Sequence, residues 1–383
     1  MLKHTRIIAV VGSYGKTTTR AIAAAAVGDG ASPRGPVQRS LFGIPPSHPC
    51  AVLEVGIDRP GQMAPIASIL RADTAIVTSI GTEHITSLGT LENIRHEKAH
   101  MVRSLSRDGL AILNGDDPNV MWMAGETRAK VVTFGLGEHC DVRATDVRLE
   151  WPVGLSFLVH AGGESCRVRT KFLSRHFVPQ FLSAAAAATS EGVALLEFAR
   201  RVEPVKPVHG RMQIKQLGNG AVLLCDYYKS NYETMHTALD TLAEVPARRH
   251  VVVFGDVTEP PGSPATVYGG LGERIAKIAD WAVFVGEGFR RYRAGAVRAG
   301  MRKEALFHAG YSVQAAAELL AAELGPGDVV LIKGRGTQKL DRIALALEGR
   351  TVKCGLVTCY LRNPRCAECS KLECGWGETA PVT

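Results

Sequence analysis

Short apolar runs alternate with amphipathic stretches along the first third of the chain. Three runs closed by Gly, Glu or Ser have the pattern of buried strands: residues 5–11, 50–55 and 74–80. Helical periodicity lies between or after them, at residues 16–27, 61–71 and 90–106. Because strands and helices alternate, the pattern predicts a mostly parallel sheet that is covered on both faces.

The pattern changes near residue 140. Residues 140–172 alternate polar and apolar positions with few helix signals, which predicts an antiparallel patch. The Ala-rich residues 182–199 predict one helix. Residues 202–207 contain Glu-Pro-Val-Lys-Pro, which ends the helix and forms a stiff linker.

Beyond this linker the alternation restarts. Strands are expected at residues 221–226, 249–255, 281–285 and 328–333. Helices are expected at residues 232–244, 269–279, 312–323 and 338–347. The fold class is therefore α/β: a P-loop ATPase-type domain over residues 1–206, a smaller Rossmann-like domain over 207–350, and a Cys-rich tail over 351–383.

Composition narrows the function classes. The chain has 383 residues, of which 21% are charged and 46% hydrophobic, as in ordinary globular proteins. No apolar run approaches the roughly 18 residues that span a bilayer, and the N-terminus has no signal-peptide pattern, so we expect a cytoplasmic protein. The net charge of +8 comes from scattered Lys and Arg residues, which favours anionic substrates over nucleic acid.

The segment at residues 6–20 carries the strongest chemical signal. An apolar run, a turn with Gly12, Gly15, Lys16 and Thr17, and an Ala-rich helix follow in the order of a phosphate-binding loop. The first glycine of the usual G-x-x-x-x-G-K-[ST] pattern is Val10 here. Backbone N–H groups and the helix N-terminus favour an anion at such a turn, so the segment predicts binding of a nucleoside triphosphate with Mg²⁺.

Two more residues follow predicted strands at the same edge of the sheet. Glu54 ends a strand beside the loop, where its carboxylate can reach Mg²⁺; capping of the next loop is the alternative. His84 follows the strand at 74–80, and on its own a histidine there is more often a packed core residue than a ligand.

Nine short segments occur in an order that resembles the Mur ligase family, the ATP-dependent amide-forming enzymes of cell-wall synthesis. The matches lie at residues 9–18, 53–56, 78–84, 97–98, 113–118, 209–212, 226–231, 254–256 and 333–335. They cover about residues 1–348 and most resemble the branch that ligates D-alanyl-D-alanine to a UDP-N-acetylmuramoyl-tripeptide. One such motif would be weak, but nine in register are specific.

The resemblance implies roles for residues of the first domain. It implies two Mg²⁺ ions, with Thr17, Glu54, His84 and a carbamylated Lys98 as ligands. It implies an ATP site whose first-domain residues are Gly12, Ser13, Gly15, Lys16, Thr17, Thr18, Asn114, His176 and Gln180. The family's adenine-site asparagines are Phe177 and Gln180 here; Gln180 still offers an amide, and Phe177 is expected to stack on the base.

The resemblance also implies roles in the second domain. Arg211 would approach the γ-phosphate, and Asp226 and Asn231 would line the nucleotide cleft. Lys333 and Arg335 would hold the carboxylate of the amine substrate, although the family's serine is missing between them and a charged loop end is the alternative. Lys16, Lys98, His84 and Arg211 are the expected catalytic residues.

Five cysteines crowd the tail: Cys354, Cys359, Cys366, Cys369 and Cys374. In a cytosolic chain this clustering favours a metal over disulfides, and four thiolates suffice for Zn²⁺. An iron–sulfur cluster and metal-free thiols are the alternatives.

The expected function is an ATP-dependent ligase that joins a carboxylate to an amine through an acyl phosphate. Its substrates would be small molecules or peptides. Family members usually carry an N-terminal UDP-binding domain, and this sequence begins at the ATP loop. We therefore keep a non-cell-wall acceptor (polyglutamate, cyanophycin or tetrapyrrole-cofactor type) and a non-catalytic ATP-binding subunit, with a protein partner docked on the tail, as alternatives.

Overall fold

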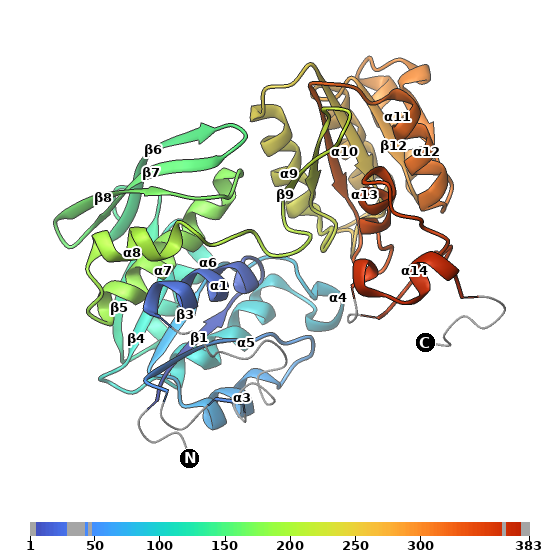
Figure 1. The fold of residues 1–383 in the computed structure, drawn as a ribbon. Helices are drawn as coiled ribbons and strands as arrows, with labels where there is room; N and C mark the ends of the chain where they lie inside the picture. Colours follow the sequence, from blue (N-terminus) through green and yellow to red (C-terminus); the bar gives the residue numbers. More distant parts are fainter. Residues whose placement is uncertain (1–4, 29–42, 45–47, 362–364, 377–383) are drawn as a thin grey trace. The chain divides into compact units, whose positions relative to one another are not determined.

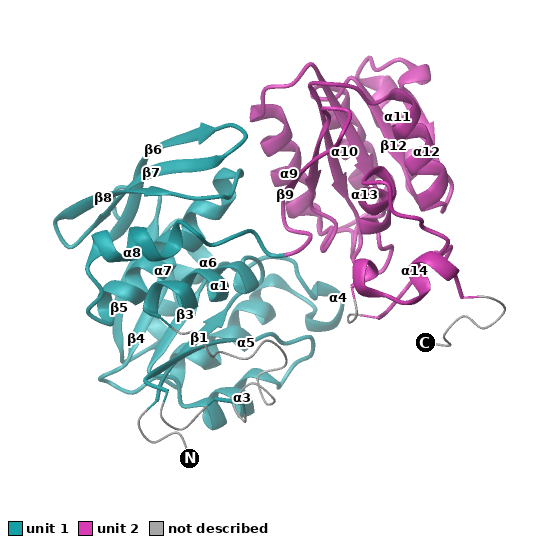
Figure 2. Cartoon of the chain, viewed as in Figure 1, with its two compact units in different colours: residues 1–208 teal, residues 209–383 magenta. Residues whose placement is uncertain are grey.

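The computed structural model describes residues 5–28, 43–44, 48–361 and 365–376. The chain divides into two compact units, residues 1–208 and 209–383, which are coloured separately in Figure 2. Each unit is built around its own sheet (Figure 1). Within the described ranges, no helix combines the length and apolarity needed to cross a bilayer.

Unit 1 contains an eight-stranded sheet in the order β2-β1-β3-β4-β5-β6-β7-β8. Its strands are β1 Arg6–Val11, β2 Cys50–Glu54, β3 Thr74–Val77, β4 Leu110–Asn114, β5 Lys130–Gly135, β6 Val142–Glu150, β7 Gly154–Ala161 and β8 Glu164–Arg169. The strands from β2 to β6 pair in parallel, whereas β6, β7 and β8 pair antiparallel. The expected parallel sheet and antiparallel patch are thus both present, joined in one sheet.

The helices of unit 1 cover this sheet. They are α1 Lys16–Val27, α3 Met63–Leu70, α4 Ile85–Leu88, α5 Leu91–Arg103, α6 Pro118–Met121, α7 Val178–Ser190 and α8 Leu195–Val202, with the short 3₁₀ helices η1 Trp122–Glu126 and η2 Arg175–Phe177. Helix α1 packs against α7 and α8, and α3 packs against α5. On β1, Ile7 and Ala9 join the core that contains Ile94 of α5, while Ile8 faces away and is equally buried. Burial on both faces explains the continuous apolar run of this strand.

Unit 2 contains a six-stranded sheet in the order β13-β12-β11-β14-β10-β9. Its strands are β9 Gln213–Gln216, β10 Val222–Cys225, β11 Arg249–Phe254, β12 Trp281–Phe284, β13 Leu306–His308 and β14 Asp328–Lys333. All neighbours pair in parallel except the edge strand β9, which runs antiparallel to β10. This is a second α/β unit with its own core, as the sequence predicts.

Five main helices flank the second sheet: α9 Tyr232–Glu244, α10 Pro264–Ala276, α11 Phe289–Arg298, α12 Val313–Glu323 and α13 Asp341–Leu347. Helices α10 and α11 pack together, as do α12 and α13. The short elements are η3 Lys303–Ala305 and, in the tail, η4 Cys366–Glu368 and α14 Lys371–Cys374. Leu372 of the tail is buried together with Leu345 of α13, so the tail packs on unit 2.

Some predicted helix boundaries are wrong. The single helix expected at 182–199 is two helices, because Gly192 adopts a left-handed φ of 81° between α7 and α8. The helix expected at 269–279 begins earlier, at Pro264, where the Ser263 hydroxyl accepts a hydrogen bond from the N–H of Thr266. Helix α11 was not predicted; its Gly295 lies so close to α10 that an added Cβ would come within 1.9 Å of the Gly269 carbonyl oxygen.

Candidate active site

The turn between β1 and α1 has the geometry of a phosphate loop. Gly15 is the N-cap of α1 with φ of 82°, and Gly12 has φ of 137°. A Cβ at Gly12 would lie 2.0 Å from the Thr78 hydroxyl oxygen, so a side chain does not fit there. Val10 lies within β1 and is fully buried, and Gly12 supplies the turn that the usual first glycine would supply.

Lys16 is the first residue of α1, and its side chain folds back over the loop. Its ammonium donates to the carbonyl oxygens of Gly12 at 2.8 Å and Ser13 at 2.9 Å. It also forms an ion pair with Glu83 at 2.8 Å, and both side chains are buried. The Lys16 ammonium therefore connects the phosphate loop and α1 to the segment after β3.

Oxygen atoms suited to a divalent cation meet at the end of β2. The Thr17 hydroxyl donates to a Glu54 carboxylate oxygen at 3.0 Å. Glu54 is the last residue of β2, whose neighbour β1 leads directly into the loop. A hydroxyl and a carboxylate side by side are hard oxygen donors, and so they fit the preference of Mg²⁺. Thr18, the next residue, is 1% exposed.

The segment after β3 binds the loop through several hydrogen bonds. The N–H of Ser13 donates to the Ser79 carbonyl at 2.7 Å, and the N–H of Gly81 donates to the Ser13 hydroxyl at 2.9 Å. The Thr78 hydroxyl lies 2.6 Å from the Tyr14 carbonyl oxygen. His84 belongs to the same segment as the N-cap of α4, with a left-handed φ of 63°, directly after Glu83.

Lys98 comes from α5 and reaches the same loop. Its ammonium donates to the Gly12 carbonyl at 2.6 Å and to the Ser13 hydroxyl at 3.2 Å, and the residue is 2% exposed. The Gly12 carbonyl therefore accepts from two lysine side chains. Burial, and secondly the nearby charge of Lys16, holds the pKa of Lys98 well below its ordinary value.

The loop after β4 contains Asn114 and Asp117, which hold neighbouring loops in place. The Asn114 amide donates to the Thr78 carbonyl at 2.9 Å. The Asp117 carboxylate accepts from the N–H of Ile80 at 2.8 Å and also caps α6. Asn114 therefore supports the segment that carries Thr78, and its expected contact with the nucleotide stays a prediction.

The segment that precedes α7 brings a further amide to the loop. An added Cβ on Gly15 would lie 2.6 Å from the Gln180 amide, so this side chain covers Gly15. The His176 ring nitrogen Nδ1 lies 2.5 Å from the Ser174 hydroxyl. Phe177 is only 4% exposed and packs edge-on against Phe172. In this structure the Phe177 ring belongs to the aromatic core, and its expected stacking on a base stays a prediction.

Unit 2 has its own cluster of site residues from the sequence prediction. The Lys333 ammonium at the end of β14 donates to Asp226 at 2.6 Å and to the Lys229 carbonyl at 2.9 Å, and Lys333 is 1% exposed. Burial lowers the pKa of Lys333, Asp226 opposes that shift, and Arg211 adds to it. The Arg211 guanidinium lies 4.9 Å from the centre of the Tyr228 ring.

The predicted substrate residues Lys333 and Arg335 both have partners within unit 2. The predicted carboxylate-binding Lys333 is already paired with Asp226, so it is an internal cation of the unit. Arg335 donates to the Val257 carbonyl at 2.8 and 3.1 Å. Asn231 is the N-cap of α9 and is 5% exposed. Whether Lys333 and Arg335 contact substrate stays a prediction.

One residue that the sequence did not single out connects this cluster. The Gln338 amide oxygen accepts from the N–H of Asp256 at 2.9 Å and from the N–H of Arg335 at 3.2 Å. Its amide nitrogen donates to the Asp256 carboxylate at 3.2 Å and the Val285 carbonyl at 3.2 Å. Burial raises the pKa of Asp256, and the N–H of Gly288 opposes that shift.

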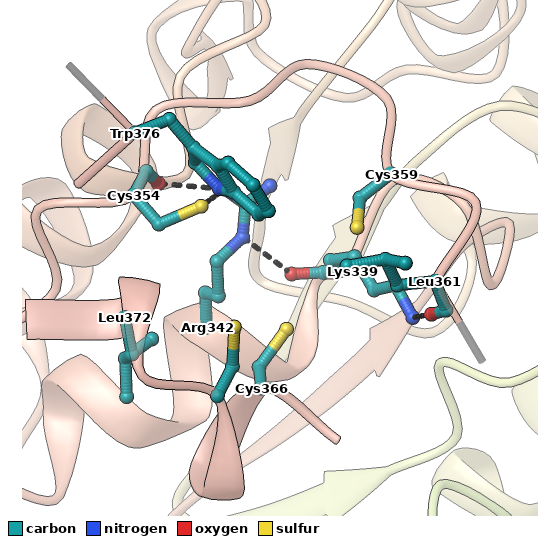
Figure 3. A pocket seen from close by; sticks show the side chains of 9 residues that line it. Lys339, Arg342, Cys354, Cys359, Leu361, Cys366, Leu372 and Trp376 are labelled. Carbon is teal, nitrogen blue, oxygen red and sulfur yellow. Dashed lines mark hydrogen bonds between the residues drawn. The ribbon is translucent and has the colours of Figure 1, made fainter. Parts of the chain in front are cut away.

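The tail forms a pocket on unit 2, drawn in Figure 3. Four of its five cysteines line it together with side chains of α13 and the tail: Lys339, Arg342, Cys354, Cys359, Leu361, Cys366, Cys369, Leu372 and Trp376. Cys374 is not among the lining residues; it is exposed, and its thiol donates to the Ser370 carbonyl at 3.1 Å. Burial, and secondly Asp341, raises the pKa of Cys366.

A second group of metal-type side chains lies in unit 1. Ligand atoms of Asp116, His139 and Cys140 lie within 4.8 Å of one another. The Asp116 carboxylate accepts from the N–H groups of Leu136 and Gly137, so it has a structural role in this turn. Burial, followed by Asp116, raises the pKa of Cys140 to about 11. Among the residues that the structure covers, the tail thiols are not spaced as closely as this group.

Comparison with known proteins decides the family. Residues 10–188 match the Mur ligase middle domain, and residues 210–336 match the Mur ligase glutamate ligase domain. The UDP-N-acetylmuramoyl-tripeptide–D-alanyl-D-alanine ligase of Mycobacterium bovis is 30% identical over 374 residues, covering 89% of this chain and 72% of that protein. The chain belongs to the Mur ligase family.

Solved structures agree with this Mur ligase fold. A crystal structure of MurF from Acinetobacter baumannii has a TM-score of 0.81 at 25% identity and covers 91% of this chain and 78% of that one. MurF ligase from Thermotoga maritima in complex with ADP has a TM-score of 0.78 at 20% identity and covers 90% and 80% of the two chains. The recognition of the family from its motifs is confirmed, and the protein is an ATP-dependent acid–amino-acid ligase.

The sequence prediction did not single out several buried polar residues of this Mur ligase that connect its loops. Glu83 is buried against Lys16, and Gln338 and Arg342 are buried in unit 2. A signal existed for Glu83, because it stands between Thr82 and His84 in a segment that already matched the family. No local pattern marked Gln338 or Arg342, since apart from contacts within four positions their partners lie far away in the chain or in the tail.

Proposed function

We propose that this Mur ligase joins the amine of a D-alanyl-D-alanine-type dipeptide to the carboxylate of a UDP-N-acetylmuramoyl-tripeptide-type acceptor. The relatives whose names carry this activity align over most of both chains. The observation that supports ATP-driven chemistry most directly is the loop itself. Two buried lysine ammonium groups donate to one carbonyl oxygen beside the Thr17–Glu54 oxygen pair. That arrangement suits a polyanion with a divalent cation.

The proposed reaction has two steps. A carboxylate oxygen of the acceptor attacks the γ-phosphorus of ATP, the bond to the bridging oxygen breaks, and ADP leaves. The amine nitrogen then attacks the acyl carbon, the C–O bond to phosphate breaks, and nitrogen loses a proton. Phosphorylation is needed because phosphate is a far better leaving group than oxide.

In this proposal Lys16 binds the outer phosphates, and Gly12, Ser13, Gly15 and Thr18 shape the loop around them. Arg211 would meet the charge that develops on the transferred phosphoryl group, since a guanidinium matches phosphate geometry. Asn114, His176, Gln180, Asp226 and Asn231 would line the nucleotide site, and Lys333 and Arg335 would lie near the incoming amine substrate.

We propose two Mg²⁺ ions as cofactors, because the side chains present fit them. Thr17 and Glu54 would hold one ion, and His84 with a carbamylated Lys98 would complete the second site. Bound Mg²⁺ would offset charge on the phosphate oxygens. The low pKa of Lys98 favours the neutral amine that reacts with carbon dioxide. For the tail we propose Zn²⁺, since four thiols line one pocket.

Phosphate release tests the substrate assignment. The purified chain should release phosphate from MgATP only when the UDP-linked tripeptide and D-alanyl-D-alanine are both present, and mass spectrometry should find the amide product. L-alanyl-L-alanine, which has the same atoms with inverted centres, is the matched control and should give little product. Phosphate release only with another acid–amine pair would show that the proposed substrates are wrong. Binding of ATP without any turnover would overturn the ligase proposal.

A further inference from the structure

The thiols of the tail divide into four that share a pocket and one that does not. Cys354 and Cys366 are buried, Cys359 and Cys369 are half-buried, and all four line the pocket in Figure 3. Cys374 is exposed and donates to nearby carbonyl oxygens at 3.1 and 3.5 Å. A tetrathiolate site needs four sulfur ligands, and the pocket selects which four.

A buried cation lies beside these thiols. Arg342 of α13 is 1% exposed, and its guanidinium donates to the carbonyl oxygens of Cys354 at 2.6 Å and Leu356 at 2.6 Å. The same group reaches the Cys354 sulfur at 3.4 Å. These partners are neutral, and across the described ranges no carboxylate forms an ion pair with it.

A buried cation is costly when no anion lies nearby, and the adjacent carboxylate of Asp341, which is 7% exposed, is one buried negative charge in this region. Four thiolates around a divalent ion carry a net charge of about minus two, by the protonation rule for metal-bound cysteine. The guanidinium N–H that reaches the Cys354 sulfur would then donate to a metal-bound thiolate, and outer contacts of this kind orient the ligands of a metal site.

The tail is hydrogen-bonded to the loop that follows β14. The N–H of Cys359 donates to the Thr337 carbonyl at 2.8 Å, and the Lys339 ammonium donates to the Leu361 carbonyl at 2.5 Å. Arg342 donates to the Gln338 carbonyl at 3.1 Å. Because Gln338 also binds the N–H of Arg335, the tail supports the loop that follows Lys333 and contains Arg335.

We propose that Cys354, Cys359, Cys366 and Cys369 form a tetrathiolate zinc site in which Arg342 donates to the Cys354 sulfur, and that this site positions the 334–340 loop for the amine substrate. The first part of this proposal, the ligand set, specifies the zinc site that we propose above. The second part rests on the proposed ligase function. Binding of the ion releases the thiol protons and draws the four sulfurs together.

Metal analysis of the full chain, purified without chelator, tests the ligand set independently of activity. Wild type and Cys374→Ser should each contain one zinc per chain, whereas Cys359→Ser and Cys369→Ser should lose it. Iron with acid-labile sulfide, no metal in wild type, or loss of zinc from Cys374→Ser would overturn the site. Because a cysteine variant can misfold, cobalt added to zinc-stripped wild type gives a second readout, and the spectrum of a tetrahedral tetrathiolate is expected.

Kinetics test the positioning role. In Cys359→Ser the KM for D-alanyl-D-alanine should rise about tenfold, while the KM for ATP stays near that of wild type. Cys374→Ser is the matched control and should change neither value. Equal changes in both KM values, or a fall in kcat alone, would mean that the tail contributes only stability. Should wild type be inactive with this substrate pair, the ligase proposal fails while the zinc content still stands.

Discussion

Two buried lysines, one in each unit, have opposite electrostatic surroundings. Lys333 in unit 2 is 1% exposed and forms an ion pair with Asp226. Lys98 in unit 1 is 2% exposed, yet its partners are a carbonyl and a hydroxyl, and the charge that shifts its pKa is another cation, Lys16. Burial lowers the pKa of both, but only Lys333 has an anion that opposes the shift.

The difference separates a structural lysine from one prepared for chemistry. An ion pair keeps Lys333 charged, so its main effect is to hold Asp226 and the end of β14 together. A lysine that is buried without an anion favours the neutral form, which is nucleophilic and can be modified. Lys16 is intermediate: it has Glu83 as a partner and also donates to the two carbonyls of the phosphate loop.

Removal of Lys16 should give the largest effect of the three lysines. Lys16→Ala should lower phosphate release by about a thousandfold, because one charged contact to the transferring group is lost. Steady-state assays under saturating substrates measure this. Lys215→Met, at the exposed pair with Glu348, is the control and should retain turnover. Unchanged turnover in Lys16→Ala would show that the loop does not bind the phosphates.

Breaking the ion pair in unit 2 should mainly affect stability. Asp226→Asn keeps the shape but leaves the Lys333 ammonium buried without an anion, so the free energy of unfolding of unit 2 should fall by about 3 kcal/mol. Urea unfolding, followed by a probe in unit 2, measures the loss. The double variant Asp226→Asn with Lys333→Met should recover most of it; no recovery would mean that the pair is not the cause.

Replacement of Lys98 itself should change stability in the opposite direction. Lys98→Met removes a buried amine whose charged form has no anion as a partner, so in buffer depleted of carbon dioxide the variant should be more stable by about 1 kcal/mol. A lowered pKa destabilises the folded wild type below that pKa, and this cost disappears as pH rises toward the ordinary value of 10.5. The advantage of Lys98→Met should therefore shrink with rising pH in urea titrations. A growing advantage would contradict the assignment.

The smallest expected effect is on the KM for ATP, from removal of the Gln180 amide that covers Gly15 of the phosphate loop. Gln180→Ala should raise the KM for ATP about threefold, which corresponds to one neutral hydrogen bond, and should leave the KM for the amine substrate unchanged. Gln314→Ala removes an amide that contacts the tail in unit 2, and it is the matched control for nucleotide binding. An equal effect of both variants on the KM for ATP would remove Gln180 from the nucleotide site.

The sequence predicted the fold well where burial patterns are regular. The apolar run of β1 and the following glycine turn predicted a strand, loop and helix that the structure contains. The prediction failed where a single backbone conformation decides the outcome, as at Gly192, or where glycine serves close packing, as at Gly295. Periodicity reports which faces are buried, and it carries no information on such local choices.

For the candidate site, the motifs located the residues but not their partners. The sequence placed Glu54 beside Thr17, and their side chains meet at 3.0 Å. It assigned Lys333 to a substrate, whereas the structure gives that lysine a carboxylate partner more than a hundred positions away. Such long-range pairs depend on which strands become neighbours in the sheet, and a single sequence does not specify this.

Asp117 has a consequence for motion in unit 1. One of its carboxylate oxygens holds the N–H of Ile80 after β3, and the other holds the N–H groups of Asn119 and Val120 at the start of α6. Two segments that are separate in the chain are thus held by one side chain. Amide hydrogen exchange at these three positions should accelerate together when this carboxylate is neutralised, because the strand-end segment and the helix start would then open as one unit.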